Sequence, residues 1–367
     1  MNRPRFILLG GFLGAGKTTA LARLARHYRD QGLNVGIVTN DQSQDLVDTY
    51  SLREQGMSVE EVAGACFCCR FNDLMDRIAD LQADARPDVI LAEPVGSCTD
   101  LVATVIRPLA DLYGQRFRVA PYVVMFKPSH GRKILLRAES GFSPKAAYIF
   151  EKQLEEADAI ALNRVDELSP AEVDELMRML QQRFPGVPTL AISAKTGTGF
   201  PALLELLDCD GRFGQRVLTI DYDVYAEGEA EMGWVNASYR WESATAVSLD
   251  QLLREVLSAI AARIRANRGE IGHLKAIGLS EGTYAVGNVV SVDAPVELSL
   301  PSGEAVTSGD LVVNARALLD PDILRAIIED QVAEAAARHG ATSRWLRCQS
   351  LRPGRPVPTH RYAAPTS

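Results

Sequence analysis

The sequence has few histidines and no tract of them, since only five are scattered through 367 residues. Histidine-rich tracts support metal storage, so that function is not expected here. Basic residues are not in excess either, because 39 lysines and arginines stand against 47 aspartates and glutamates, a net charge of −8. This balance argues against a dedicated nucleic-acid-binding protein.

Long apolar runs are also missing, because none approaches the roughly 18–20 residues that a membrane span needs. We therefore expect a cytoplasmic protein with no membrane partner. Cysteine is sparse, with six residues in the chain, and disulfides are rare in that compartment. Apolar residues nevertheless make up 47% of the chain, enough for a real core, and the length suits two domains.

The run GFLGAGKT, residues 11–18, matches the phosphate-binding loop G-x-x-x-x-G-K-[ST]. An apolar run precedes it and a helical pattern follows it, which is the context such a loop requires. Its backbone N–H groups would surround a β-phosphate, Lys17 would reach the β- and γ-phosphate oxygens, and the Thr18 hydroxyl would bind Mg²⁺. The alternative is a glycine-rich turn that binds nothing, but a Lys-Thr pair after Gly16 serves no turn geometry. The sequence therefore predicts a nucleoside triphosphate site.

The first part of the chain alternates short apolar runs with helical patterns, which is typical of a mostly parallel sheet with helices on both faces. We predict an α/β P-loop NTPase fold for residues 1–212. Ligands of such sheets bind at the carboxyl ends of the strands. The predicted strands are 6–10, 35–40, 89–93, 119–126, 159–163 and 189–193, and helices between them include 100–112, 144–157, 170–183 and 200–208.

The pattern then changes to that of a smaller α+β domain, predicted over residues 213–352. Its order of elements is β-α-β-β-α-β, which indicates a ferredoxin-like layer. The tail 353–367 is rich in proline and arginine, and we expect it to be loosely ordered. The predicted elements are strand 217–241, helix 249–268, strands near 272–279 and 284–298, strand 311–316, helix 321–339 and strand 343–351.

Three further motifs lie at strand ends in the order that a guanine-nucleotide switch protein requires. Glu93 would hold a Mg²⁺-bound or attacking water, and the Gly96 N–H would sense the γ-phosphate. In the NRVD motif, the carboxylate of Asp166 would accept both the ring N1–H and the exocyclic amine of guanine, a pairing that adenine cannot supply. The SAK motif at 193–195 would back the base. Taken singly, NRVD or SAK fits an ordinary strand-end turn as well as a nucleotide site, but together, in order and at strand ends, the motifs predict a guanine-nucleotide site.

On these residues the chain resembles the CobW/UreG-like metallochaperone GTPases, which include the hydrogenase factor HypB. The resemblance covers about residues 5–208 and includes GGFLGAGKTT, GACFCCRFNDL, EPVG and NRVD. The first two look CobW-like, whereas VTND at 38–41 and EPVGSCTDLVATVIRPL at 93–109 look closer to UreG. The resemblance implies Mg²⁺-dependent GTP hydrolysis coupled to delivery of a transition metal, or a metal-containing cofactor, to a client metalloenzyme. We also expect a nucleotide- or metal-dependent homodimer.

Two positions depart from that family's pattern. The CobW-type Glu-Asn-Glu is here TND, which leaves Asp41 as the candidate switch and Mg²⁺ carboxylate, with Asp45 and Asp48 in reserve. Arg164 replaces the usual lysine beside the base, and although its alkyl stem can stack there, the two side chains are not interchangeable. The catalytic candidates are Lys17, Asp41, Glu93 and Gly96. The nucleotide-binding candidates are Gly11, Gly14, Ala15, Gly16, Lys17, Thr18, Thr19, Asn163, Arg164, Asp166, Ser193, Ala194 and Lys195.

Three of the six cysteines lie together in a C-x-C-C motif, as Cys66, Cys68 and Cys69. If the backbone turns after Cys68, the three thiolates can hold one Zn²⁺, Co²⁺ or Cu⁺ ion and leave one position open; Zn²⁺ and Co²⁺ are the leading candidates. Cys98 is a candidate fourth donor because it follows Gly96. Two alternatives stay open, namely buried structural cysteines and redox chemistry of the vicinal pair. The remaining two, Cys209 and Cys348, lie alone and are expected to be structural.

The function that these motifs favour is a GTP-switched metallochaperone with a C-terminal domain that recognises the client. An ATP-dependent P-loop enzyme is one rival, and a regulatory GTPase with structural or redox cysteines is another. The basic segment 127–145, with Arg132, Lys133 and Arg137, is interpreted as a solvated loop, the alternative being a loop that docks a partner or covers the nucleotide.

Overall fold

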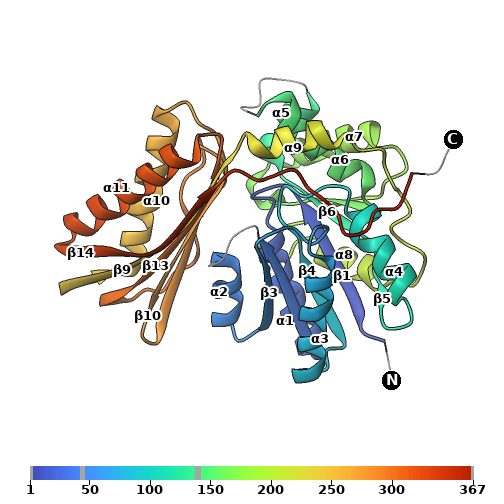
Figure 1. The fold of residues 1–367 in the computed structure, drawn as a ribbon, viewed down its shortest axis with the longest axis horizontal. Helices are drawn as coiled ribbons and strands as arrows, with labels where there is room; N and C mark the ends of the chain where they lie inside the picture. The colour runs from blue at the N-terminus through green and yellow to red at the C-terminus, as the bar shows by residue number, and fades with distance from the viewer. Residues whose placement is uncertain (1–2, 42–45, 137–141, 365–367) are drawn as a thin grey trace. The chain divides into compact units, whose positions relative to one another are not determined.

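The computed structural model of the chain describes residues 3–41, 46–136 and 142–364, which fall into two units (Figure 1). The first unit comprises residues 1–42, 56–228 and 355–367, and the second comprises residues 43–55 and 229–354. Both units therefore combine segments that are distant in the sequence. We describe each unit by itself.

The first unit is built on a parallel sheet with the strand order β3-β2-β4-β1-β6-β7-β8, and the short β5 also pairs with β1. Strand β1 is buried at every position after its first residue. Burial on alternating sides means that both faces of the sheet are covered, as in other parallel sheets. The strands are β1 (Arg5–Gly11), β2 (Val35–Asp41), β3 (Ser58–Ala63), β4 (Val89–Glu93), β5 (Arg118–Val119), β6 (Val123–Phe126), β7 (Ala159–Leu162) and β8 (Thr189–Ala191).

Helices connect and cover these strands, and their ends follow local sequence signals. Helix α7, for example, begins at a capping box in which Ser169 and Glu172 each accept a backbone N–H of the other. The predicted fold class is confirmed. The helices are α1 (Lys17–Asp30), α3 (Phe71–Asp84), the π-helical η1 (Val102–Ile106), α4 (Arg107–Tyr113), α5 (Pro128–Leu135), α6 (Pro144–Glu156), the 3₁₀ turn η2 (Val165–Glu167), α7 (Pro170–Arg183), α8 (Phe200–Asp208) and α9 (Tyr222–Ala230).

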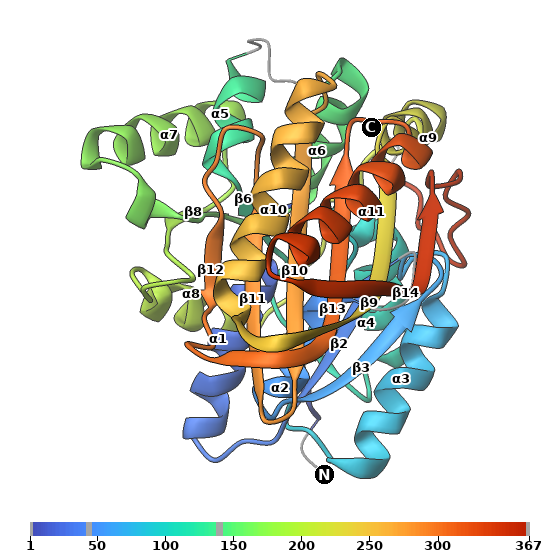
Figure 2. The ribbon, with the colours of Figure 1, turned by 90° about the vertical axis from the view of Figure 1, so that its left-hand side faces the viewer.

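The second unit contains an antiparallel sheet with the order β12-β11-β10-β13-β9-β14 (Figure 2). Its core order β10-β13-β9-β14, with α10 after β9 and α11 after β13, is that of a ferredoxin-like βαββαβ layer, and β11 and β12 extend one edge. Both helices pack their apolar residues on one face of this sheet. The elements are β9 (Gly233–Ser248), α10 (Leu249–Ala266), β10 (Ile271–Ser280), β11 (Thr283–Val289), β12 (Glu297–Leu300), β13 (Ala305–Ala317), α11 (Pro321–Arg338) and β14 (Ala341–Leu351).

A short helix from the N-terminal half, α2 (Val47–Glu54), belongs to the second unit. The side chain of Val47 packs with Ile277, Val286 and Val312, and its N–H donates to the Asn314 side chain at 2.7 Å. Apolar burial and a buried hydrogen bond explain why this segment leaves the expected 1–212 domain. Neither α2 nor β3 was among the elements predicted from the sequence.

The C-terminal boundaries also differ from the expected ones. The predicted strand 217–241 is divided, because α9 occupies its middle and β9 begins only at Gly233. Residues 355–362 of the expected loose tail contact the first unit through backbone hydrogen bonds, among them Tyr362 N–H to the Ala103 carbonyl at 3.0 Å. Proline-rich composition predicts little local structure, but it does not report such tertiary contacts. Across the described ranges, every helix falls short of the length or apolar character that crossing a bilayer demands.

Glu156, at the C-terminal end of α6, carries a buried carboxyl group. It accepts the Val102 N–H at 2.9 Å and the Thr99 hydroxyl at 3.3 Å. Burial, only partly offset by these bonds, raises the pKa of Glu156 to about 8. In the folded chain the Glu156 carboxyl therefore keeps a proton that it loses in the unfolded chain at a pH of about 4.3. Because the folded state binds more protons in this window, stability decreases as pH rises from about 4.3 to about 8.

We predict that Glu156→Gln removes this pH dependence, since the neutral amide oxygen can accept the Val102 N–H while the amide NH2 donates to the Thr99 hydroxyl oxygen. The difference between the free energies of unfolding, Glu156→Gln minus the unmodified chain, should rise by up to about 1.4 kcal/mol per pH unit. It should level off above a pH of about 8. Urea titrations at several pH values measure it. Equal pH slopes for the two proteins would contradict the assignment, and Glu155→Gln, at the neighbouring half-buried carboxyl, should keep the unmodified slope.

Candidate functional site

The phosphate loop leaves β1 and enters α1 through glycines with left-handed backbone angles. Gly11, Gly14 and Gly16 have φ values of 131°, 73° and 91°. A Cβ on Gly16 would lie 2.4 Å from Nδ2 of Asn163, and one on Gly11 would lie 2.5 Å from the Met125 carbonyl oxygen. Glycine is therefore required by close approach as well as by φ. The loop forms the N-terminus of α1, where backbone N–H groups attract an anion.

The predicted Mg²⁺ and γ-phosphate residues gather beside this loop. The Lys17 ammonium donates to the Gly11 carbonyl at 2.9 Å and lies 4.0 Å from Glu93. The Thr18 hydroxyl donates to Glu93 at 3.1 Å. Asp41 ends β2, and β2 pairs with β4, which ends in Glu93. Two carboxylates thus end adjacent parallel strands, next to a lysine and a threonine, which suits Mg²⁺ and phosphate.

Gly96 closes the same region from the other side. A Cβ there would lie 2.6 Å from the Leu13 side chain and 3.1 Å from the Leu13 nitrogen. The Gln153 amide fixes this turn by donating to the carbonyls of Gly96 at 3.0 Å and Cys98 at 2.8 Å. The loop after β4 is therefore held directly against the phosphate loop, where the sequence predicts a γ-phosphate sensor.

The predicted base-binding motifs also come together. The Asn163 amide donates to the Ala15 carbonyl at 2.8 Å and accepts the Ala194 N–H at 2.9 Å, so it links the phosphate loop to the SAK turn. The Ser193 hydroxyl donates to Asp166 at 2.6 Å and orients its carboxylate. Arg164 has φ of 67° and holds Glu167 through two hydrogen bonds, one of them 2.9 Å long. This ion pair fixes the guanidinium beside the Asp166 turn.

One buried lysine in this region was not singled out from the sequence. Lys127 follows β6, is fully buried, and directs its ammonium to the Leu13 carbonyl at 3.4 Å. It adds positive charge beneath the phosphate loop. The position of Lys127 could have identified it, because a lysine directly after an apolar strand lies at the ligand edge of a parallel sheet. In the sequence analysis Lys127 is instead counted with the basic segment 127–145. In that segment Arg132 pairs with Glu175 on α7 at 2.8 Å, whereas Arg137 lies outside the described residues.

The three cysteines of the C-x-C-C motif converge as predicted. Their sulfurs are 2.9 Å (Cys66 to Cys68), 3.3 Å (Cys66 to Cys69) and 3.8 Å (Cys68 to Cys69) apart. Within the described ranges they are the one group of His, Cys, Asp or Glu residues whose geometry suits a metal ion. Cys66 and Cys68 are buried, and Cys69 is half-buried. A tetrahedral ion with bonds of about 2.3 Å spaces two sulfurs by about 3.8 Å, so the residues present fit a thiolate-bound metal.

Hydrogen bonds inside the cluster favour one thiolate. Thiol donors on Cys68, Cys69 and Cys98 lower the pKa of Cys66 well below its ordinary value. The bond to Cys66 raises the pKa of Cys69 to about 11, and the same interaction raises that of Cys68. Cys98, buried in the loop after Gly96, thus acts on Cys66, but it is not a member of the group of three cysteines whose sulfurs all lie within 4.8 Å of one another. Cys209 and Cys348 lie elsewhere, as expected.

The side chain of Asn40 attaches the cysteine loop to the end of β2. Its amide donates to the carbonyls of Val62 at 2.9 Å and Ala65 at 2.8 Å, and its oxygen accepts the Phe67 N–H at 2.8 Å. Asn40 directly precedes the candidate switch carboxylate Asp41. In the sequence, Asn40 stands out only as part of the VTND run, and nothing there indicates this role.

The two reserve carboxylates have different outcomes. Asp45 lies outside the described residues. Asp48 is on α2 in the second unit, where both of its oxygens lie within 2.7 Å of the Lys275 ammonium. This ion pair gives Asp48 a structural role there, and of the two described candidates Asp41 is the one at the carboxyl edge of the parallel sheet.

The comparisons with known proteins agree with this geometry. Residues 5–190 match the family described as "CobW/HypB/UreG, nucleotide-binding domain". The chain belongs to the CobW/HypB/UreG family. It is 30% identical over 183 residues to the zinc chaperone YeiR of Escherichia coli K12, covering 48% of this chain and 51% of YeiR. It is 26% identical over 229 residues to the zinc chaperone CobW of a Sinorhizobium species, covering 54% of this chain and 60% of CobW. It is 25% identical over 214 residues to the urease accessory protein UreG of Metallosphaera sedula, covering 54% of this chain and 90% of UreG.

These matches cover only part of the chain and only part of some relatives. The chain spans about half the length of YeiR and three-fifths of CobW. The family establishes a nucleotide-binding domain, and the geometry adds a three-cysteine group that suits a metal. The second unit lies outside the matched residues 5–190, apart from α2.

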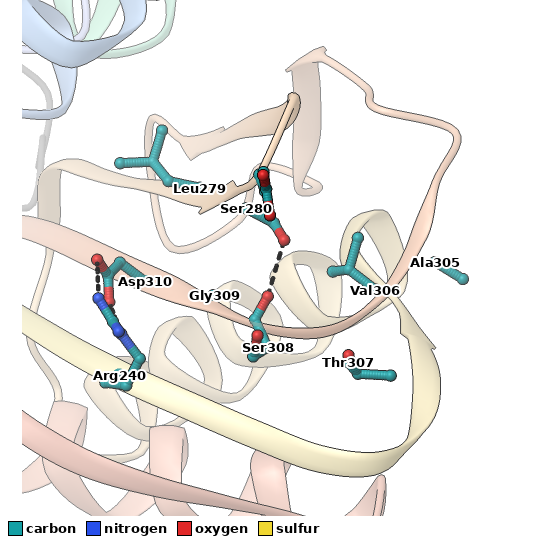
Figure 3. A pocket seen from close by; sticks show the side chains of 10 residues that line it. Arg240, Leu279, Ser280, Ala305, Val306, Thr307, Ser308, Gly309 and Asp310 are labelled. Atoms are coloured by element: carbon teal, nitrogen blue, oxygen red, sulfur yellow. Dashed lines mark hydrogen bonds and ion pairs between the residues drawn. The ribbon is translucent and has the colours of Figure 1, made fainter.

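The second unit has a surface pocket of its own, of about 540 Å³ (Figure 3). Arg240 and Asp310 form an ion pair at its edge, with one contact at 2.8 Å. The Ser280 hydroxyl donates to the Ser308 carbonyl at 2.8 Å. We assign no chemistry to this pocket.

We predict that Asn40→Ala loosens the cysteine loop, because it removes three hydrogen bonds worth about 0.5–1.5 kcal/mol each. Cys66 and Cys68 should then react with Ellman's reagent about tenfold faster or more, since a lower opening free energy exposes them more often. The measurement uses a Cys209→Ser background to remove the exposed thiol. Asn40→Asp keeps the acceptor for Phe67 but sets a carboxylate oxygen against the Val62 and Ala65 carbonyls, so it should also loosen the loop. Equal rates for all three proteins would show that Asn40 does not hold the loop.

Proposed function

We propose that the protein is a GTP-hydrolysing metallochaperone that binds a transition metal through Cys66, Cys68 and Cys69. The observation that carries this proposal is the attachment of the cysteine loop, through Asn40, to the strand that ends in Asp41. A metal site is thereby joined to a candidate nucleotide switch. Membership of a family whose relatives include zinc chaperones supports the same function.

Each nucleotide-site residue has a task in this function. Lys17 neutralises the β- and γ-phosphates, and Thr18 with Asp41 would hold Mg²⁺, which supplies Lewis-acid stabilisation of the phosphate charge. Glu93 orients the attacking water or a metal-bound water, and the Gly96 N–H faces the γ-phosphate. Because GDP lacks that phosphate, contacts at Asp41, Glu93 and Gly96 differ between the two nucleotide states.

Guanine specificity would come from Asp166, whose carboxylate is oriented by Ser193. Its two oxygens match the two donors on the guanine edge, whereas adenine offers no such pair. Arg164 would stack its stem over the base, and Ala194 with Lys195 would close the pocket. This base recognition separates the proposal from an ATP-dependent P-loop enzyme.

The metal cargo would be Zn²⁺ or Co²⁺. Three thiolates supply a soft donor set, and Cys98 would have to move toward them to become the fourth donor, because it is not among the three sulfurs that lie together. A fourth ligand from the loop after Gly96 would connect the ion to the γ-phosphate sensor. The proposed cargo goes to a client metalloenzyme that the ferredoxin-like unit recognises, and a nucleotide- or metal-dependent homodimer completes the proposal.

We predict that GTP and GDP bind at least about tenfold tighter than ATP, since each lost pairing at Asp166 costs on the order of 1 kcal/mol or more. Asp166→Asn should weaken GTP binding and strengthen binding of xanthosine triphosphate, whose 2-oxo group prefers a donor. Competition against a fluorescent GDP analogue measures both effects, with Glu167→Gln as the matched control on the same turn. Equal competition by ATP and GTP would contradict a GTPase.

We predict one thiolate-bound Zn²⁺ or Co²⁺ per monomer or per dimer. The combined change Cys66→Ser, Cys68→Ser, Cys69→Ser should abolish the Co²⁺ charge-transfer band, because hydroxyls do not replace thiolates for these ions. Cys98→Ser should weaken binding by about tenfold or more if it removes a ligand. Cys348→Ser, in the second unit, is the control and should bind metal normally. Unchanged binding by the triple variant would favour the regulatory GTPase with structural or redox cysteines.

A further inference from the structure

A stretch far from the cysteine motif in the sequence lies directly against it. Residues 355–362, called the 355–362 segment below, follow β14 and cross the first unit toward α4, as the dark red trace in Figure 1 shows. Three hydrogen bonds join this segment to the motif. The Val357 N–H donates to the Cys69 sulfur at 3.2 Å, the Thr359 N–H to the Cys68 carbonyl at 2.8 Å, and the Thr359 hydroxyl to the Cys69 carbonyl at 3.1 Å.

The next residues anchor the segment in the loop that follows Cys98. The Arg361 guanidinium donates to the Asp100 carboxylate at 2.7 Å, and Asp100 is 1% exposed. The Tyr222 hydroxyl donates to the same carboxylate oxygen at 2.8 Å. Removing the guanidinium would leave a buried carboxylate without its cation, which is costly. The segment is therefore held at both the cysteine motif and the Cys98 loop.

The contact with Cys69 involves the backbone of the segment rather than its side chain. Val357 is 73% exposed, so its isopropyl group contributes little burial. It lies between Pro356 and Pro358, which have no N–H, so its amide is the donor that this stretch can offer. Cys69 in turn is the most exposed of the three thiols of the motif. An N–H donor is thus placed on the sulfur from which a metal would be most easily removed.

We propose that the 355–362 segment is part of the metal site, with the Val357 amide as a hydrogen-bond donor to the metal-bound Cys69 thiolate. The segment then acts as a strap, so that exchange of the metal requires it to leave Cys69. The proposal rests on the proposed metal site and adds a positioning group to it. An N–H donor lowers the electron density on a thiolate, and such outer groups tune both the ligand and its metal.

The strap also connects the metal to the nucleotide loop. Arg361 holds Asp100, which lies four residues beyond Gly96, and Thr359 holds the backbone of Cys68 and Cys69. A displacement of the loop after Gly96 therefore pulls on the strap through Arg361. The same segment would make metal release sensitive to the state of the γ-phosphate sensor.

The test compares Val357→Pro with Val357→Ala in the full chain. Both variants lose the isopropyl group, but only the proline variant loses the N–H. We expect Val357→Pro to shift the thiolate-to-Co²⁺ charge-transfer band to lower energy, because the sulfur becomes more electron-rich. It should also release Zn²⁺ to a chromogenic chelator about tenfold faster or more than Val357→Ala does. Loss of the hydrogen-bond partner of a metal ligand has effects of about this size on metal binding.

A second pair of variants tests the anchor without touching the cysteines. Arg361→Gln combined with Asp100→Asn replaces the ion pair with a neutral hydrogen bond, so no buried charge is left. Zn²⁺ release should accelerate here too, while the charge-transfer band stays nearer to that of the unmodified chain. Ala364→Pro, beyond the anchored residues, is the control for a new proline near this segment, and its release rate should be unchanged.

Two results would overturn the proposal, and they differ from failure of the metal site itself. Val357→Pro with the band energy and release rate of Val357→Ala would show that the amide does nothing. Unchanged release in the Arg361→Gln, Asp100→Asn variant and in a variant lacking residues 355–367 would show that the segment does not restrain the metal. Absence of any thiolate band in the unmodified protein would instead refute the proposed metal site.

Discussion

The side chain of Asn40 is the contact on which the proposed coupling depends. It makes three hydrogen bonds to the backbone around the cysteine motif while sitting next to Asp41 at the end of β2. β2 is paired along its length with β3 and β4, so its end cannot move independently of the sheet. Whatever shifts Asp41 must therefore move the cysteine loop or break these bonds.

The loop after β4 provides the second connection. It begins at Glu93, passes Gly96 against the phosphate loop, and continues to Cys98, whose thiol contributes to the lowered pKa of Cys66. A parallel sheet brings the carboxyl ends of β1, β2 and β4 to one edge. The sheet topology thus brings the candidate nucleotide site and the loop that leads to Cys98 to the same edge. Helix α2, which comes after Asp41 in the sequence, is anchored in the second unit by Val47 and Asp48.

Much of the first unit could be predicted from the sequence, because its signals are local. Apolar runs gave β1, β2, β4 and β7 to within a residue or two, and helical patterns gave the first residues of α6 and α7, each of which begins with a proline after a serine cap. The strand-end motifs were placed correctly at one edge because parallel topology leaves no alternative. The three sulfurs converge because the motif itself turns, as the Cys69 N–H to Cys66 carbonyl bond shows.

The features that were missed depend on distant contacts. α2 is short, and only its packing against β10, β11 and β13 identifies it as part of the second unit. The segment at 355–362 has a composition typical of loose tails, and its order comes from partners more than 250 residues away, such as Cys69. Lys127 was grouped with neighbouring charges because burial cannot be seen in a charge pattern. Local propensity reports local structure, whereas these three features are tertiary.

The most direct test of the account is the affinity for Zn²⁺ in the two nucleotide states. Chelator competition would measure the Zn²⁺ dissociation constant of the full chain with GDP and with a non-hydrolysable GTP analogue. We predict that the two constants differ by about fivefold or more, and that saturation with Zn²⁺ changes the ratio of GTP-analogue to GDP affinity by the same factor, as linkage requires. Equal Zn²⁺ affinity in both states would contradict a nucleotide-switched metal site, even if the three cysteines bind the ion.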